Sequence, residues 1–387
     1  DLAKERDPND PTPWFYDAIQ KQTQNRPVEA LRDIQKSIEL NNNRAVYRSK
    51  LLLDKDEAAR GSSLARIYDN LGFEKRAIME TAKSLSHDPS NHSAHRFLAD
   101  IYANMPRHAT AQASELLQAQ LLQQVNVNPV QAGLAIIDTA IVGTNPPSPG
   151  LNEFTTIAER NKPQILASGI VGSNSTLGNE TVVSAVYDRA SFSLGQFHYD
   201  TKGFRQNNNQ THNVYNAFMQ YAVTPKFNVQ AELRTRGTEN GKLLLDFDRD
   251  SPDPNVAKDP FLNPNNRYRR DLNEDIARFG ARYAISPKQD FIVSGIYAHR
   301  KDNLQDFARL GIDFFEGSHD HNYQGEFQYL LRENNYNIVA GGGIYQIDVN
   351  RKQLIRQLQN SDERCDMSGS NVICDINFSR KKINGYL

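Results

Sequence analysis

The chain of 387 residues is long enough for two domains, and its charges almost cancel, with 45 Lys and Arg against 46 Asp and Glu. That balance argues against nucleic acid as a partner, because nucleic-acid binding requires a clustered basic surface. No run of about 18 apolar residues occurs, which excludes helical membrane spans but not a membrane β-barrel, whose strands keep one polar face.

Residues 11–125 contain an internal repeat. Its two clearest copies are 34 residues apart: Leu64, Ala65 and Tyr68 of one copy recur as Leu98, Ala99 and Tyr102 of the next. A weaker, earlier copy contains Trp14, and Asp88 with Pro89 marks the end of a helix in the second copy. A fixed period of this length predicts stacked helical pairs, each of which buries its apolar face against the next.

These residues resemble the tetratricopeptide repeat. The residues expected to pack within and between its units are Trp14, Ala65, Tyr68, Ala77, Ala99 and Tyr102. Asp17 and Lys21 depart from the pattern, because they stand where it has apolar residues. The resemblance implies a scaffold whose concave face binds a periplasmic protein or a polymer, and the alternative is an array that only positions the domain after it.

Residues 126–163 are predicted to link a helical domain at 1–125 to a β domain at 164–387. Prolines mark loops on both sides of one apolar run, 132–142. We expect this run to pack on the last helical unit or to plug the mouth of the second domain. Proline-rich turns make the linker semi-stiff, so it would hold the helices near one rim of that domain.

From residue 164 the chain changes to segments of about ten residues in which apolar and polar side chains alternate. Strand side chains point to opposite faces with a period of two, so each segment is predicted to be a strand with one apolar face. We expect about ten strands, with a bulge near Gly195 and a close approach at the glycines of 341–343. The apolar faces are marked by Tyr215, Val229, Phe279 and Tyr329.

The connections between these strands fall into a short and a long set. The short ones span 224–226, 286–290 and 332–335, and the long ones span 201–212, 237–271, 301–320 and 350–370. Strict alternation of the two sets is typical of a transmembrane β-barrel, whose apolar face contacts outer-membrane lipid. A soluble all-β domain, with a second sheet over the apolar face, is the alternative.

Polar side chains on the opposite strand faces would line the lumen of such a barrel. Five of them are charged: Glu232, Arg234, Arg278, Arg282 and Glu326. They predict either a charged lumen that selects polar or anionic cargo, or plain ion pairing between neighbouring strands.

Two cysteines, Cys365 and Cys374, lie in or beside the last long connection. Their spacing permits a disulfide that closes an extracellular loop, and free thiols are the alternative.

No metal site or active site is expected. The acidic stretch 246–253 lacks the glycine and the closing acidic residue of an EF-hand loop, and His319 with His321 lacks a third ligand. No order of Ser, His and Asp can be assigned to a triad, and no glycine-rich phosphate loop follows a strand. We therefore expect neither an enzyme nor a bound cofactor.

The two ends of the sequence suggest a longer protein. The first ten residues are charged and lack the features of a signal peptide, while 382–387 resemble the interior of a strand. We expect that a leader was removed or that the chain begins inside a longer protein, and that further strands follow.

Repeats followed by a barrel resemble two groups of bacterial proteins, the outer-membrane exporters of exopolysaccharide and the repeat-bearing relatives of TonB-dependent receptors. No plug domain precedes residue 164, which departs from the second group. The resemblance implies a periplasmic tetratricopeptide α-superhelix followed by an antiparallel transmembrane β-barrel, which moves a polymer or polar solute across the bacterial outer membrane. The alternative is a structural or interaction protein, in which the barrel anchors the repeats or displays surface loops.

Overall fold

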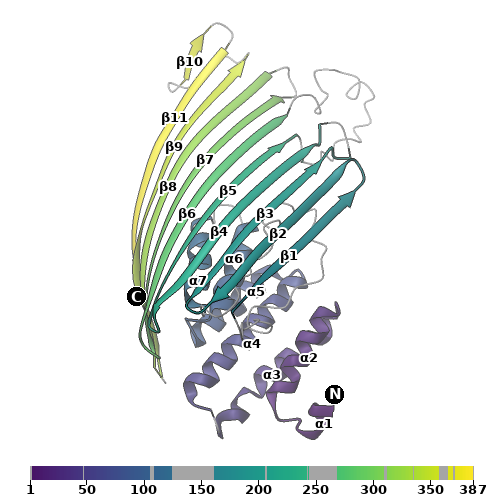
Figure 1. Ribbon diagram of the computed structural model, residues 1–387. Helices are drawn as coiled ribbons and strands as arrows, with labels where there is room; N and C mark the ends of the chain where they lie inside the picture. Colours follow the sequence, from purple (N-terminus) through teal and green to yellow (C-terminus); the bar gives the residue numbers. More distant parts are fainter. Residues whose placement is uncertain are drawn as a thin grey trace.

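The computed structural model has a helical region followed by one large antiparallel sheet (Figure 1). The predicted order, helices first and strands second, is therefore confirmed. The first helices lie farthest from the sheet, and the last helix contacts it. The structure describes residues 2–46, 48–104, 109–123, 161–204, 207–241, 243, 268–308, 312–333, 335–356, 365–368 and 371–386.

Seven α-helices and one 3-10 helix are present in the described part of the helical region. They are α1 (Leu2–Arg6), α2 (Pro11–Thr23), α3 (Pro27–Glu39), η1 (Asn41–Val46), α4 (Lys50–Asn70), α5 (Glu74–His87), α6 (His92–Asn104) and α7 (Ala109–Leu122). Local signals fix several ends. The Asp10 side chain accepts from the Thr12 amide at 2.9 Å before α2, and Gly72, with a φ of 82°, follows α4.

The helices pack as three successive pairs, α2 with α3, α4 with α5, and α6 with α7. A β-carbon at Gly61 of α4 would lie 3.2 Å from the Ser84 β-carbon of α5, so a small residue permits this close approach. Tyr68 packs against the apolar clusters on both sides of it, and Tyr102 packs against the second cluster. Three alanines are buried between helices: Ala65, Ala77 and Ala99.

Ion pairs tie the first helical pair together at the two positions that depart from the repeat pattern. Lys21 contacts Asp17 at 2.9 Å and Asp33 at 2.5 Å, and Lys4 of α1 lies 3.1 Å from Asp33. Burial alone would raise the pKa of Asp17, but hydrogen bonds from Lys4 and Lys21 hold it well below its ordinary value. Trp14 packs beside this cluster, where its indole nitrogen donates to a backbone carbonyl of the turn after α1 at 3.1 Å.

The strands form one antiparallel sheet in the order β1-β2-β3-β4-β5-β6-β7-β8-β9-β11-β10. They are β1 (Lys162–Gly172), β2 (Thr176–Tyr187), β3 (Ala190–Thr201), β4 (Gln210–Thr224), β5 (Phe227–Asn240), β6 (Arg269–Ser286), β7 (Gln289–Ala308), β8 (Ile312–Arg332), β9 (Asn337–Arg356), β10 (Cys365–Ser368) and β11 (Asn371–Tyr386). The two end strands do not pair with each other, so the sheet is open over the described residues. None of the described helices has the length and apolar character needed to cross a bilayer.

Successive connections lie at opposite ends of the sheet. Those after β2, β4, β6 and β8 are short and lie at the end next to the helices (Figure 1). At the far end, β7 and β8 pair from Ala308 and Ile312 onward, so the long loop predicted over 301–320 is wrong. Residues 299–303 and 317–321 are polar or glycine on both faces, which hides the period of two there, whereas the backbones still pair by cross-strand hydrogen bonds.

The two faces of the sheet differ in composition and exposure. On the outer face, turned away from the helices, Tyr215, Phe279 and Phe327 are 53%, 55% and 52% exposed. On the inner face, Gln230 and Glu232 are each only 3% exposed. The predicted alternation is confirmed, and no second sheet covers the apolar face within the described residues.

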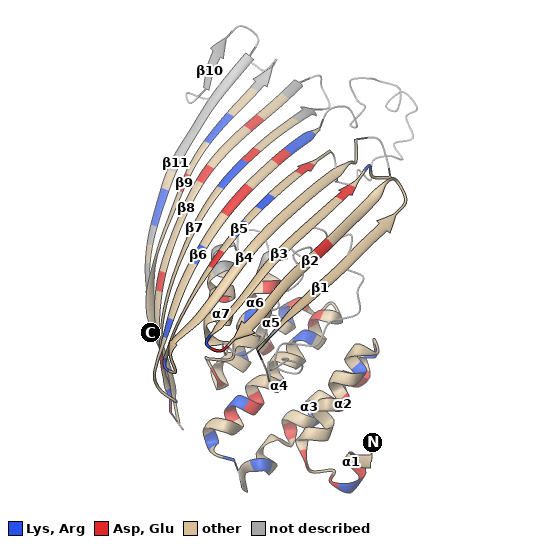
Figure 2. Cartoon of the chain, viewed as in Figure 1, with Lys and Arg blue, Asp and Glu red and all other residues tan. Residues whose placement is uncertain are grey.

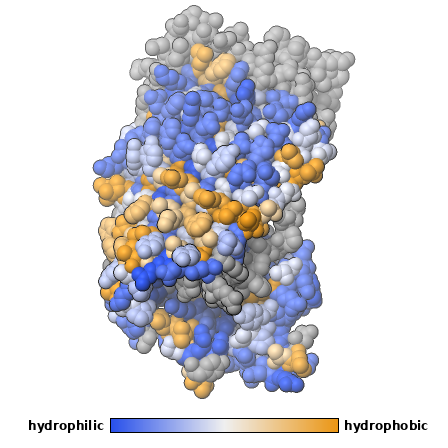
Figure 3. Space-filling model, in the orientation of Figure 1, coloured by the Kyte–Doolittle hydropathy of each residue, from blue (hydrophilic) through white to orange (hydrophobic). Residues whose placement is uncertain are grey.

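The apolar residues of the outer face gather at one level. Figure 3 shows them as a band across the sheet, with hydrophilic side chains above and below. Figure 2 shows that Lys, Arg, Asp and Glu are concentrated in the upper halves of β5 to β9, beyond this band.

Strand β3 pairs regularly with both neighbours through Gly195, so the bulge predicted there is wrong. The apolar phase shifts for another reason. Leu194 is exposed on the outer face, whereas Phe197 and Tyr199 are buried in an apolar cluster on the inner face. Both faces of β3 are therefore apolar in part, and periodicity alone does not separate this case from a bulge.

Candidate functional site

The inner face of the sheet holds helix α7 against β5, β6 and β7. Leu121 of α7 is fully buried and packs with Ile292 and Leu330. A β-carbon added at Gly280 of β6 would lie 2.8 Å from a methyl carbon of Leu121, so glycine permits the close approach of the helix. Helix α7 therefore fills the space between the other helices and the middle of the sheet.

Gln120 joins α7 to strands β4 and β5. Its backbone carbonyl accepts from Gln220 Nε2 at 3.3 Å, and its side-chain oxygen accepts from Gln230 Nε2 at 3.1 Å. Its side-chain nitrogen donates to Glu232 at 3.4 Å. These polar contacts fix the rotation of α7 about its axis more specifically than the apolar contacts of Leu121 do.

Glu232 is at the centre of the inner-face charges. It pairs with Arg278 of β6 at 3.0 Å, accepts from Asn216 of β4 at 2.7 Å, and shares its face of β5 with Arg234. Both members of the Glu232–Arg278 pair are nearly fully buried. Removal of either one would leave a buried charge without its partner, which typically costs about 3–5 kcal/mol.

The other two predicted lumen residues contact α7. Arg282 donates to the carbonyl of Leu122, at the end of the helix, at 3.4 Å, and Glu326 accepts from Ser114 Oγ at 2.6 Å. All five predicted charges thus lie on the inner face. The Glu232–Arg278 pair is of the kind that the ion-pairing alternative predicts, whereas Arg282 and Glu326 contact a helix, which neither alternative included. Helix α7 as their partner was not expected, because its sequence lacks charges apart from Glu115.

A second buried cluster of charges joins the sheet to the helices. Arg332, at the end of β8, contacts Asp290 of β7 at 2.8 Å and Asp88 of the α5–α6 turn at 3.5 Å, and also donates to Ser90 Oγ. Asp290 is 0% exposed and contacts Arg282 at 2.8 Å as well. No sequence pattern indicated this cluster, because its partners are far apart along the chain.

Helix α6 adds two histidines beside α7. His95 lies with Nδ1 2.5 Å from Glu115 of α7 and Nε2 2.9 Å from the Pro89 carbonyl. Burial alone would lower the pKa of His95, but Glu115 outweighs burial and raises it. Burial lowers the pKa of His92 to about 4, and the charges of His95 and Arg282 act in the same direction.

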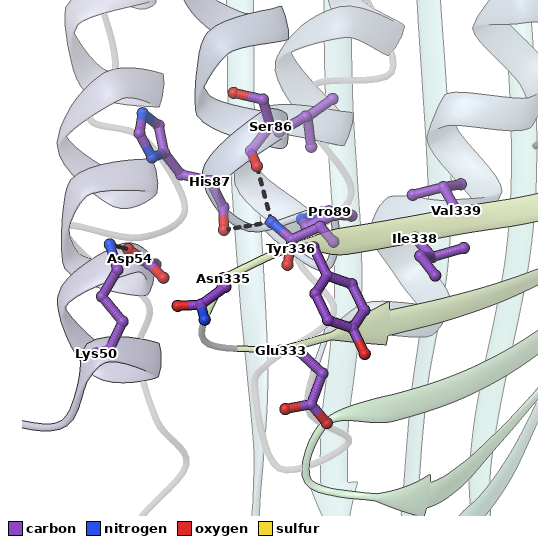
Figure 4. A pocket seen from close by; sticks show the side chains of 12 residues that line it. Lys50, Asp54, Ser86, His87, Pro89, Glu333, Asn335, Tyr336, Ile338 and Val339 are labelled. Atoms are coloured by element: carbon purple, nitrogen blue, oxygen red, sulfur yellow. Dashed lines mark hydrogen bonds and ion pairs between the residues drawn. The ribbon is translucent and has the colours of Figure 1, made fainter.

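A cleft of about 690 Å³ opens between the helices and the β8–β9 turn (Figure 4). Lys50 and Asp54 of α4 and His87 of α5 form one wall, and Tyr336 lies in the turn that forms the other. Asn337 holds the walls together, since its amide donates to two carbonyls at the end of α5 at 2.8 and 3.2 Å. The cleft thus combines charged and amide side chains with one exposed ring and with apolar residues such as Ile338 and Val339.

A smaller hollow of about 150 Å³ lies between α3, α4 and α5. Arg76 lies 5.6 Å from the centre of the Tyr68 ring on its wall, and Glu57 lies 3.3 Å from Nε2 of His87. Because His87 lines both the hollow and the cleft, the two adjoin. A ligand held by the helices would therefore lie next to the short-turn end of the sheet.

Cys365 and Cys374 are directly opposite each other in the β10–β11 pair. Opposed positions of an antiparallel pair bring α-carbons to about 4.5–5.5 Å, a separation that a disulfide accepts. The disulfide stays a prediction. The acidic stretch 246–253 and the apolar run 132–142 lie outside the described residues.

His319 and His321 lie on one face of β8, as expected for an extended segment. The ring of His321 stacks on His299 of β7 with a centroid separation of 4.7 Å. No group of three or more His, Cys, Asp or Glu that could hold a metal ion occurs in the part of the chain that the structure describes.

Comparisons with known proteins do not assign the chain to a family. The sequence matches no protein-family model, and a search of curated proteins gives no significant match.

Proposed function

We propose that this chain is a bacterial outer-membrane β-barrel protein with a periplasmic tetratricopeptide scaffold, and that it moves a polymer or polar solute across the outer membrane. The observation that carries the proposal is the reversed burial of the sheet. Apolar rings on its outer face are half exposed, while amides and carboxylates on its inner face are covered.

This pattern is unfavourable in water and favourable in a bilayer. A large apolar side chain gains about 1.5–3 kcal/mol on leaving water, and soluble monomers rarely expose a continuous apolar band. The band on the outer face has hydrophilic borders on both sides (Figure 3). A membrane barrel has this arrangement, with lipid against the band and polar side chains inside.

The arrangement of the connections supports an orientation. Short turns of membrane barrels face the periplasm, and long loops face the outside. Here the connections after β2, β4, β6 and β8 are short and lie beside the helices, whereas the long connections, after β3, β5 and β9, lie at the other end together with two short ones, after β1 and β7. Strands β7, β8 and β9 have 20, 21 and 20 residues, whereas about 9–11 residues span a bilayer. The excess would extend from the far side of the membrane, where the charged upper halves of these strands lie.

The adjoining hollows offer cargo a route from the scaffold to the barrel. A polymer held in the smaller hollow, beside Tyr68, would extend past His87 into the cleft, which lies beside Tyr336 at the periplasmic rim. Helix α7 stands on the inner face beyond that rim, so passage requires it to move aside. The charged inner face would then contact the cargo.

A bilayer experiment tests transport. Purified protein added to planar bilayers should give stepwise conductance, and Leu121→Ala, which removes a buried anchor of α7, should increase the open fraction. Absence of conductance from both proteins would contradict transport. On intact cells, added protease should cut the far ends of the hairpins and spare the helices, and the reverse pattern would contradict the orientation.

A structural or interaction protein is the second candidate. The observation in its favour is that α7 fills the inner face through buried apolar contacts and hydrogen bonds, as the filling of a closed barrel would. The same bilayer experiment separates the two candidates. A filled barrel stays closed in every α7 variant but still inserts in the membrane and displays its loops.

A further inference from the structure

Four titratable side chains form one row across strands β6 to β9. Asp275 is directly opposite His299, which is opposite His321. His321 is in turn opposite Asp348. Directly opposed residues share one face of a sheet, and Asp275 shares the outer face of β6 with Phe279, four positions away. The row therefore places two imidazoles between two carboxylates on the outer face.

The two imidazole rings stack, with centroids 4.7 Å apart and an angle of 24° between the ring planes. In each ring, Nδ1 faces an oxygen of the protein. Nδ1 of His321 lies 3.2 Å from the Tyr297 hydroxyl. Nδ1 of His299 lies 4.0 Å from a carboxylate oxygen of Asp275. Within the described residues neither Nε2 has a hydrogen-bond partner, so both can bind a ligand from outside the chain.

This arrangement suits a metal ion that prefers nitrogen ligands. An oxygen beside Nδ1 keeps the ring proton on that atom and leaves the lone pair on Nε2, as in most histidines that bind metals. Imidazole nitrogen suits Zn²⁺, Cu²⁺ and Ni²⁺, whereas Ca²⁺ and Mg²⁺ prefer oxygen ligands. Asp275 and Asp348 add negative charge on both sides of the pair, which attracts a cation.

We infer that His299 and His321 bind one Zn²⁺, or another ion of the same class, through their Nε2 atoms. The protein supplies two ligands and water completes the coordination, so binding is weaker than in structural zinc sites with four protein ligands. A bound ion adds a link between β7 and β8 and stabilises the folded sheet by mass action. Metal binding at this pair is independent of transport, because it requires only that the sheet forms.

Metal titration of the full chain tests this site. The protein is stripped of metal with a chelator, Zn²⁺ is added, and the heat of binding and the metal content after dialysis are measured. The wild type should bind one Zn²⁺ per chain. His299→Phe keeps a ring in the stack but removes both nitrogens, so it should lower the affinity at least about tenfold, as should His321→Ala.

Cu²⁺ identifies the ligands directly. Electron paramagnetic resonance of the copper-loaded protein should show two coordinated imidazole nitrogens in the wild type and one in His299→Phe. Asp275→Asn should keep both nitrogens and lower the Zn²⁺ affinity by about tenfold, because the carboxylate that orients His299 is lost.

His319→Ala is the matched control. His319 is exposed on the same face of β8, two residues from His321, but it lies opposite Lys301, whose charge repels a cation. This variant should bind Zn²⁺ as the wild type does. The site is overturned if the wild type binds no more Zn²⁺ than the double variant His299→Ala/His321→Ala, if His319→Ala loses as much affinity as His321→Ala, or if His299→Phe binds normally.

Discussion

Replacement of Gly280 by leucine is expected to lift helix α7 from the inner face of the sheet. The first atom added to Gly280 would already lie 2.8 Å from a methyl carbon of Leu121, and three more carbons follow it. Both side chains would compete for one space between β6 and the helix. Either Leu121 moves within a densely packed contact, or α7 moves as a unit.

The magnitude follows from what holds α7 in place. Leu121 and Leu122 are buried, and each contributes about 1.5–3 kcal/mol of apolar burial. The hydrogen bonds of Gln120 add about 0.5–1.5 kcal/mol each, and the cost of ordering the helix opposes them. Overpacking by one side chain typically costs about 1–3 kcal/mol. The ratio of docked to undocked helix should therefore fall roughly 5- to 150-fold.

Hydrogen exchange measures this ratio whatever the function of the protein. Amides of α7 should exchange faster in Gly280→Leu by a similar factor, and bilayer conductance should rise if the barrel is a pore. Ala281→Leu is the control, because it adds a larger side chain to the adjacent residue of β6 on the opposite face. The reasoning is refuted if α7 exchanges equally slowly in Gly280→Leu, Ala281→Leu and the wild type.

Further predictions concern the charges and the cysteines. Arg332→Met removes one of the two cations that contact the fully buried Asp290, and it removes the contact of Arg332 with Asp88, so it should lower the free energy of unfolding by up to about 3–5 kcal/mol in denaturant titrations. An unchanged midpoint would contradict the cluster. The pKa of Asp17 is held below its ordinary value of 3.8, so its stabilisation is present above that pH and lost as the pH falls below it. Asp17→Asn should therefore lose less thermal stability than the wild type between pH 7 and pH 3, measured by circular dichroism, and an equal loss in the two proteins would contradict this. The pKa of His92 is lowered from 6.5 to about 4, so the unfolded state binds this proton more tightly than the folded state does. The free energy of unfolding should therefore fall by up to about 3 kcal/mol as the pH drops from 6.5 to 4, and His92→Gln should remove this contribution. Without added reductant, Cys365 and Cys374 should resist alkylation, and after reduction both should react; two free thiols in the untreated protein would exclude the disulfide.

Several features of the fold were determined by the sequence alone. The period of two in β4, β5, β6 and β8 fixed the faces of these strands, because a one-residue slip would exchange every apolar and polar side chain. The 34-residue offset indicated helical pairs, since Ala65 and Ala99 stand at equivalent places in successive units. Local turn signals such as Asp88 and Pro89 marked a helix end, and α5 ends just before them.

Local pattern failed where a strand has no single apolar face. Residues 299–303 of β7 and 317–321 of β8 are polar or glycine on both faces, so they resembled a loop, although the backbones of the two strands pair without interruption. In β3 the inner face is apolar as well, so Phe197 and Tyr199 suggested a bulge that the regular register excludes. Periodicity reports the difference between two environments, and it vanishes where both faces meet similar surroundings.

Only the tertiary structure placed α7 on the inner face. The glycine at 280 does not by itself indicate that Leu121 packs against it. This contact joins distant segments, as does the hydrogen bond from Arg282 to the Leu122 carbonyl, 160 positions away. The same holds for Arg332 and Ser90, which are 242 positions apart. Alternation along the chain sets which side chains share a surface, because it is a local property of the backbone. The partner of that surface is set by packing between distant segments, which no local pattern encodes.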